Sequence, residues 1–230
     1  MLVAARNEAE RIAATLAALE LAFPGAQVWV ADDGSTDATP QIARAAGARV
    51  VRSARNIGKG AAVTHAATAA VDDARVTAGD PAYRSLFVLC DGDLGDSAAA
   101  LAPLADAVAR GDAELAVGAF ATRVGGGLGL ALAFARWAIR RRCGLRTGAP
   151  ISGQRALSEQ ALRDVLPFAA GFGMEIGMTV DAVRAGHRVV EIELDLAHRA
   201  SGRTPAGFAH RARQLVDFAR VYAARRQRRT

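Results

Sequence analysis

The sequence predicts an α/β protein with a mostly parallel sheet and helices on both faces of that sheet. Short apolar runs alternate with segments of helical periodicity through the first half of the chain, and this alternation is typical of βαβ units. Hydrophobic residues make up 51% of the 230 residues, but aromatic residues only 5%. We therefore expect a core of Ala, Val and Leu, as in layered α/β proteins.

The first half predicts five strands separated by helices. The strands are expected at Leu2–Ala5, Gln27–Ala31, Ala48–Arg52, Leu86–Cys90 and Glu114–Ala119. The helices are expected from Ile12 to Pro24, from Asp37 to Ala46, from Lys59 onward through an alanine-rich run, and from Ala98 to Arg110. Leu86–Cys90 is a continuous apolar run, which indicates a strand buried on both faces.

The second half has a different pattern. Glycines at 125–129 come first, and Pro150–Arg155 reads as a turn or a short strand. Helices are expected at Leu130–Arg142, Leu157–Leu166, Met174–Ala185 and about Phe208–Arg225, with a strand at Arg188–Leu196. We expect this half to pack on the same sheet as part of one domain, because no low-complexity linker separates it.

Composition narrows the function classes. The formal charge of +6 comes from arginine, since Lys59 is the single lysine, and no motif with interleaved aromatics indicates nucleic-acid binding. Two cysteines and no secretory leader predict a cytoplasmic protein. The basic C-terminal stretch and the apolar run at 130–139 leave open a peripheral contact with the inner face of the membrane. A homodimer is also left open.

Charged side chains follow four of the predicted strands. In a parallel sheet the strand-to-helix loops meet at one edge, where ligands bind, so Glu8, Asp33, Lys59 and Asp93 should converge. Asp91 and Asp93 are hard anionic ligands one residue apart, suited to a divalent cation that also holds phosphate oxygens. The alternative for this pair is a solvated turn after a strand. Lys59 lies in a glycine-flanked loop at a helix start, where backbone N–H groups favour anions.

Four sequence blocks carry a resemblance to a known family. They are Ala5-Arg6-Asn7-Glu8, Asp32-Asp33-Gly34-Ser35-Thr36-Asp37, Asn56-Ile57-Gly58-Lys59-Gly60 and Asp91-Gly92-Asp93. In order and spacing they resemble family 2-like glycosyltransferases, which implies the GT-A fold, a Rossmann-like nucleotide-diphospho-sugar transferase fold. Polyprenyl-phosphate sugar synthases are similar, as are glucosyl-3-phosphoglycerate synthases, the latter also through Gly171–Gly177 and His198-Arg199.

The resemblance implies a donor site in residues 1–120 and an acceptor site in residues 121–230. The residues expected to bind a UDP- or GDP-sugar are Ala5, Glu8, Asp33, Lys59, Asp91, Gly92 and Asp93. Asp91, Asp93 and His198 are expected to hold Mg²⁺ or Mn²⁺, with His198 in place of a ligand absent at Gly95. The short first strand, and Ala4 where the family commonly has proline, leave open whether the chain start is complete.

Catalysis is assigned to Asp93, through the cation, and to Glu175. In inverting relatives a carboxylate near Glu175 deprotonates the acceptor, whereas in retaining relatives it holds the donor sugar, and both roles stay open. Gln154, Arg155 and Arg199, with Arg123, are the candidates for an anionic acceptor, because guanidinium groups match phosphate or carboxylate.

The sequence therefore predicts a metal-dependent glycosyltransferase acting on a phosphate-bearing small molecule or a lipid phosphate. The alternatives are a sugar-phosphate nucleotidyltransferase and a non-catalytic nucleotide-sugar-binding protein at the membrane surface. The first alternative should carry a glycine- and arginine-rich loop after the first strand, which Ala4–Glu8 lacks.

Overall fold

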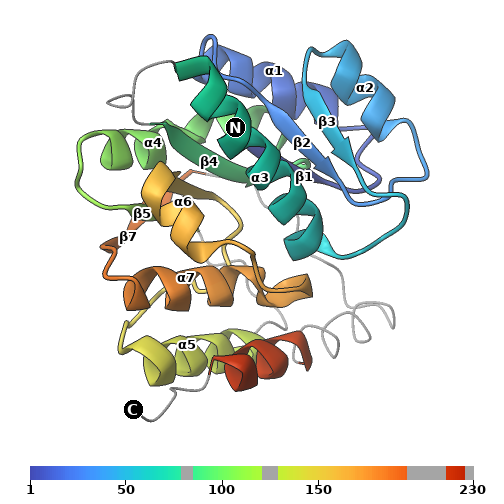
Figure 1. Cartoon of the computed structure of the whole chain (residues 1–230). Coiled ribbons are helices and arrows are strands. Elements are labelled where there is room, and N and C mark those ends of the chain that lie inside the picture. Colours follow the sequence, from blue (N-terminus) through green and yellow to red (C-terminus); the bar gives the residue numbers. More distant parts are fainter. Residues whose placement is uncertain (79–84, 121–128, 196–215, 226–230) are drawn as a thin grey trace.

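The computed structural model describes residues 1–78, 85–120, 129–195 and 216–225. A single seven-stranded sheet crosses the molecule in the order β3-β2-β1-β4-β6-β5-β7 (Figure 1). The strands are β1 (Leu2–Ala5), β2 (Trp29–Asp32), β3 (Arg49–Arg52), β4 (Leu86–Asp91), β5 (Leu115–Phe120), β6 (Arg155–Ser158) and β7 (Val189–Leu194). The expected mixed α/β sheet is confirmed.

The sheet is parallel except at β6. This strand runs antiparallel to both of its neighbours, with Leu89 opposite Arg155 and Leu115 opposite Leu157. Its first residue therefore lies at the same edge as the last residues of β1 and β4. That placement brings the segment before β6 to the edge where the predicted donor residues end their strands.

Helices cover both faces of the sheet. They are α1 (Ile12–Ala22), α2 (Thr39–Ala45), α3 (Lys59–Ala78), α4 (Ala102–Ala109), α5 (Gly129–Cys143), α6 (Glu159–Val165) and α7 (Met174–Arg184), with 3₁₀ turns η1 (Gly95–Leu101) and η2 (Gly171–Gly173). Side chains from α1, α2, η1 and α4 pack in one apolar cluster. Those from α3, α6 and α7 pack in a second cluster on the other side.

A third layer lies outside α7. Ala135 and Ile139 of α5, Ile176 of α7 and Phe218 of a helix at residues 216–224 form a separate apolar cluster. Figure 1 shows α5 and this last helix side by side below α7. The described helices include none with the length and apolar run needed to cross a bilayer.

Two sequence expectations need correction. Residues Leu157 and Ser158 were expected to begin a helix, but they belong to strand β6 and the helix α6 begins at Glu159. The helix expected from Ala98 begins as the 3₁₀ turn η1 and becomes regular at Ala102. Residues 208–215 of the last expected helix lie outside the described residues.

Candidate functional site

The single lysine stands at the centre of a charged cluster. Lys59, at the start of α3, places its Nζ 2.7 Å from Asp91 Oδ1 and 2.9 Å from Glu175 Oε1. Burial alone would lower the pKa of Lys59, but the two carboxylates outweigh burial and raise that pKa above its ordinary value. These three residues are far apart in the sequence, and the fold brings them together as charged partners from α3, β4 and α7.

The loop before Lys59 is held in place by the side chain of Asp33. Its Oδ1 accepts hydrogen bonds from the backbone N–H groups of Ile57 at 2.7 Å and Gly58 at 3.1 Å. Gly58 has φ of 91°, a left-handed conformation that glycine adopts without strain. The Asp33 side chain is buried, so in this structure it positions the Lys59 loop.

Close backbone packing explains the glycine after Lys59. A Cβ on Gly60 would lie 1.9 Å from the carbonyl oxygen of Ala169. The first turn of α3 therefore packs directly on the segment that leads into η2 and α7. This contact holds the helix that carries Lys59 against the helix that carries Glu175.

The Asp91-Gly92-Asp93 turn ends β4 beside β1. Gly92 donates its N–H to the carbonyl oxygen of Ala4 at 2.8 Å, and a Cβ on Gly92 would lie 3.2 Å from that of Ala5. Ala5 is itself buried and contacts this turn, and its carbonyl accepts from the N–H of Asp33. Asp93, in contrast, is exposed.

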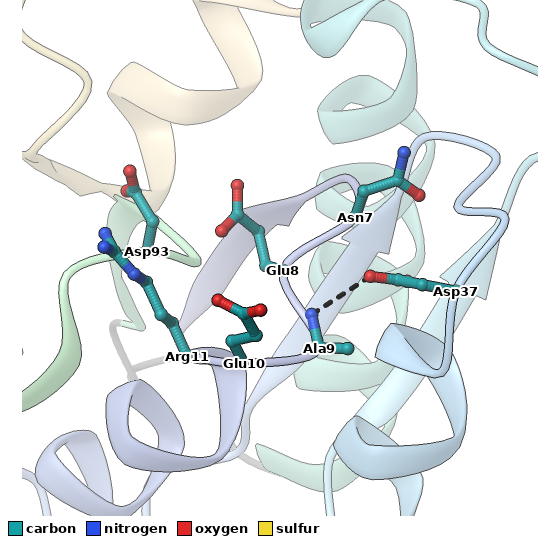
Figure 2. A pocket seen from close by; sticks show the side chains of 7 residues that line it. All are labelled: Asn7, Glu8, Ala9, Glu10, Arg11, Asp37 and Asp93. Carbon is teal, nitrogen blue, oxygen red and sulfur yellow. Dashed lines mark hydrogen bonds between the residues drawn. The ribbon is translucent and has the colours of Figure 1, made fainter. Parts of the chain in front are cut away.

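A cavity of about 370 Å³ opens beside Asp93. Its described lining consists of Asn7, Glu8, Ala9, Glu10, Arg11, Asp37 and Asp93. Figure 2 shows the carboxylates of Glu8 and Asp93 pointing the same way, with the guanidinium of Arg11 beside Asp93. Asp37 fixes the backbone of the lining residue Ala9, because its Oδ2 accepts a hydrogen bond from the N–H of Ala9 at 3.2 Å.

The electrostatics of this cavity favour a cation. Burial is the largest cause that raises the pKa of Glu8, and the nearby carboxylate of Asp93 raises it further, while Arg11 acts in the opposite direction. The charges of Asp93, Asp37 and Asp91 all act in the direction of burial, so several carboxylates converge on this cavity. Asp91 and Asp93 therefore fit a hard divalent cation by the chemistry of their oxygens.

One of the three predicted metal ligands lies beyond the described residues. Within them, no group of three His, Cys, Asp or Glu side chains is arranged to hold a metal ion. His198, Arg199 and Arg123 all lie outside the described part of the chain. Their expected roles stay predictions.

The segment before β6 reaches the cluster through Gln154. Its Nε2 donates to Asp91 Oδ2 at 3.1 Å, and the side chain is buried. The preceding Gly153 leaves no room for a side chain, since a Cβ there would lie 2.8 Å from both Asp91 Oδ2 and Lys59 Nζ. Gln154 therefore helps to hold Asp91 in place.

Arg155 lies in the interior of the protein. Only 1% of the residue is exposed. Its Nε donates to the carbonyl oxygen of Ser152 at 2.8 Å and its Nη1 to Thr179 Oγ1 at 2.9 Å. Burial lowers the pKa of Arg155 to about 10, although the carboxylates of Glu175 and Glu191 oppose that effect. Because Thr179 in turn donates to the carbonyl oxygen of Glu175, Arg155 braces the first turn of α7.

Sequence reasoning missed Arg11 and Asp37 as cavity residues. Arg11 follows Glu8 by three residues, which places both on one side of the turn that enters α1. That spacing was the available signal for Arg11. Asp37 was expected at the start of a helix; it lies two residues before α2, and its Oδ1 accepts from the N–H of Thr39 at 3.0 Å.

Comparisons with known proteins agree with this geometry. The sequence model described as "Glycosyl transferase family 2" matches residues 1–160, which end just after β6. A search of curated proteins finds no match.

Solved structures of glucosyl-3-phosphoglycerate synthase from Mycobacterium tuberculosis are similar along nearly the whole chain. The complex with phosphoglyceric acid has 28% identity and a TM-score of 0.71, over 97% of this chain and 78% of that chain. The complex with Mn²⁺, UDP-glucose and glycerol 3-phosphate has 27% identity and a TM-score of 0.71 over the same shares.

A third complex, with Mn²⁺, UDP-glucose and phosphoglyceric acid, has 26% identity and a TM-score of 0.72 over 96% of this chain and 78% of that chain. These similarities confirm the GT-A fold and the enzyme class expected from the sequence. The chain belongs to glycosyl transferase family 2.

Proposed function

We propose that this chain transfers a sugar from a UDP-sugar to a small phosphate-bearing acceptor and depends on Mn²⁺ or Mg²⁺. The convergence of Lys59, Asp91 and Glu175 beside the exposed carboxylate of Asp93 is the observation that carries the proposal. The similar synthase binds Mn²⁺, UDP-glucose and glycerol 3-phosphate in one complex, which supports the same substrate classes here.

The cation would be held by Asp93 and Asp91, with His198 as a further candidate ligand. When bound, such an ion neutralises the charge that develops on a leaving nucleotide diphosphate. Lys59 supplies a fixed positive charge beside Asp91, and we propose that it stabilises the same leaving group. Preorganised charges of this kind act without reorganisation during the reaction.

Glu8 and Asp33 are proposed to define the nucleoside side of the donor site. Glu8 lines the cavity, where its carboxylate can accept hydrogen bonds from ribose hydroxyls. Asp33 shapes this side through the Ile57–Gly58 loop.

For Glu175 we propose a positioning role toward Lys59 and the donor sugar. Its side chain is only 8% exposed and Oε1 already accepts from Lys59 Nζ. A carboxylate engaged in this way is poorly placed to take the acceptor's proton. Arg155 supports Glu175 through Thr179 and Gln154 holds Asp91, so the direct acceptor contact is proposed for Arg199.

The direct experiment is a turnover assay with UDP-glucose and 3-phosphoglycerate or glycerol 3-phosphate. Glycosylated product is followed by mass spectrometry and UDP release is followed in parallel, with Mn²⁺ and with EDTA. We expect product only with the metal. Asp93→Asn should lower metal-dependent turnover by about 100-fold or more, in the range for loss of one transition-state electrostatic contact.

A matched control tests the assignment of Asp93. Asp96 is another exposed carboxylate, three residues further on, and Asp96→Asn should leave turnover unchanged. Equal activity of wild type and Asp93→Asn would refute the proposed metal site. Absence of turnover with UDP-, GDP- and ADP-sugars alike, with either acceptor, would refute the proposed transfer.

We also propose a peripheral contact with anionic membrane from the cytoplasmic side. Trp137 of α5 is 49% exposed and packs against Tyr222, with the ring centroids 4.8 Å apart and the ring planes tilted by 36°. The exposed arginines Arg136, Arg140 and Arg141 surround it on the same helix, and Trp with Arg suits an anionic interface. Both cysteines are free, in keeping with a reducing compartment.

Vesicle sedimentation tests this contact. Wild type should bind phosphatidylglycerol vesicles and not phosphatidylcholine vesicles, and Trp137→Ala should reduce that binding. Equal sedimentation with both lipids, or a dimer on light scattering that Trp137→Ala dissociates, would contradict the membrane assignment.

A further inference from the structure

The turn that carries Asp93 is tied to helix α1 by a single hydroxyl group. Thr15, the fourth residue of α1, is completely buried. Its Oγ1 donates to the carbonyl oxygen of Gly92 at 2.9 Å and accepts from the N–H of Gly95 at 2.8 Å. One side chain thus satisfies backbone groups on both sides of Asp93.

These two bonds are unusual for a threonine inside a helix. Such a hydroxyl commonly bonds a carbonyl of the preceding turn of its own helix, whereas both of these Thr15 bonds go to the turn after β4. Within the described part of the chain, no backbone group bonds the Gly92 carbonyl or the Gly95 N–H, so the turn depends on Thr15 to satisfy them. A buried polar group left without its partner is destabilising.

The rest of the turn has little freedom to move. Gly92 is also held by its N–H bond to Ala4, and a Cβ on Gly92 would lie 3.2 Å from Ile12 Cδ1. Leu94, which lies in the sequence between Gly92 and Gly95, is buried in the core. Asp93 is therefore the exposed residue of a turn fixed before and after it.

We infer that Thr15 is a positioning residue for the Asp93 carboxylate. The inference rests on the proposed role of Asp93 in holding the cation. Thr15 touches neither cation nor nucleotide, and its effect passes through the backbone of Gly92 and Gly95. Residues that orient a metal ligand in this way contribute to metal affinity even though they do not bind the ion.

The test replaces Thr15 with valine, which keeps the shape and removes the hydroxyl. The protein is saturated with UDP and titrated with Mn²⁺, and the EPR signal of free Mn²⁺ reports the affinity. We expect Thr15→Val to weaken Mn²⁺ binding roughly 10- to 100-fold and Thr15→Ser to stay within about twofold of wild type. Amide exchange at Gly95 should become faster in the valine variant even without metal.

Two further variants separate positioning from stability. Leu16→Ala removes a buried side chain of the same helix that makes no hydrogen bond to the turn, so it should lower the melting temperature and leave Mn²⁺ affinity unchanged. If Thr15→Val does not fold, Thr15→Ala is measured in its place, with the same expected loss of affinity.

The outcomes distinguish this inference from the proposed function. Wild-type Mn²⁺ affinity in the Thr15 variants, together with lost affinity in Asp93→Asn, would overturn the positioning role and leave the metal site standing. Wild-type affinity in Asp93→Asn would overturn the metal site itself, and the role of Thr15 with it. Equal loss of affinity in Leu16→Ala would show a general effect of stability and would also overturn the inference.

Discussion

Removal of the Lys59 ammonium group should destabilise the protein because it leaves two carboxylates facing each other. Lys59→Met keeps most of the apolar stem but takes away the charge 2.7 Å from Asp91 and 2.9 Å from Glu175. At such separations each attraction amounts to about 6 kcal/mol at an effective dielectric constant of 20, before the opposing cost of desolvation.

The net loss is smaller than the sum of these attractions. Removing one partner of a fully buried ion pair costs about 3–5 kcal/mol. Here the side chain of Glu175 is 8% exposed, but those of Lys59 and Asp91 are 30% and 35% exposed, so solvent screens part of the effect. We expect Lys59→Met to lower the free energy of unfolding by about 2–4 kcal/mol.

Urea unfolding at neutral pH measures this loss, with Lys59→Arg as the control that retains a positive charge. The double variant Lys59→Met with Glu175→Gln should be more stable than the two single losses add up to, by about 1–2 kcal/mol, because no carboxylate is then left unpaired at position 175. A loss below about 0.5 kcal/mol in Lys59→Met, or strict additivity in the double variant, would refute the reasoning.

Two more predictions concern other parts of the fold. Glu114 accepts from the backbone N–H and the guanidinium of Arg188, which lower the Glu114 pKa from 4.5 to about 2. A carboxyl pKa that is lower in the folded state adds stability above the unfolded value, and this is lost as pH falls toward 2. Glu114→Gln should therefore cost up to about 1 kcal/mol at pH 7, and the cost should vanish as the pH falls through 2, as measured by urea unfolding; a pH-independent difference would contradict this cause. Thermal melts should show that Gly60→Ala lowers stability by about 1–3 kcal/mol, because its Cβ would lie 1.9 Å from the carbonyl oxygen of Ala169. The control Gly129→Ala should be neutral in the same melts, because a Cβ there meets nothing within 4 Å.

The sequence was informative where chemistry and local pattern agree. Leu86–Cys90 could be assigned to a buried strand because a continuous apolar run of that length has few other solutions. Lys59 stood out as the single lysine in a glycine-flanked loop, and the parallel sheet explains why it meets Asp91. Those assignments needed only strand direction and turn chemistry.

Strand β6 shows where sequence reasoning reached its end. Leu157 and Ala161 are four residues apart, a spacing that suits a helix, and the helix expected there concealed a strand of four residues. Arg155 was expected at an acceptor site because a guanidinium group matches phosphate or carboxylate, and the structure shows sheet pairing on both sides of β6 that encloses it. A tertiary contact of this kind leaves no periodic trace in the sequence.

The antiparallel strand also has a consequence for assembly. Since β6 lies between β4 and β5, β5 cannot join the rest of the sheet until β6, which begins 35 residues after β5 ends, has paired with both strands. A chain cleaved within residues 121–128 would thus give an N-terminal fragment with β1 to β5 and a C-terminal fragment with β6 and β7. The N-terminal fragment would lack the strand that pairs with both β4 and β5. Recovery of activity should then require both pieces together, and neither should form the charged cluster by itself.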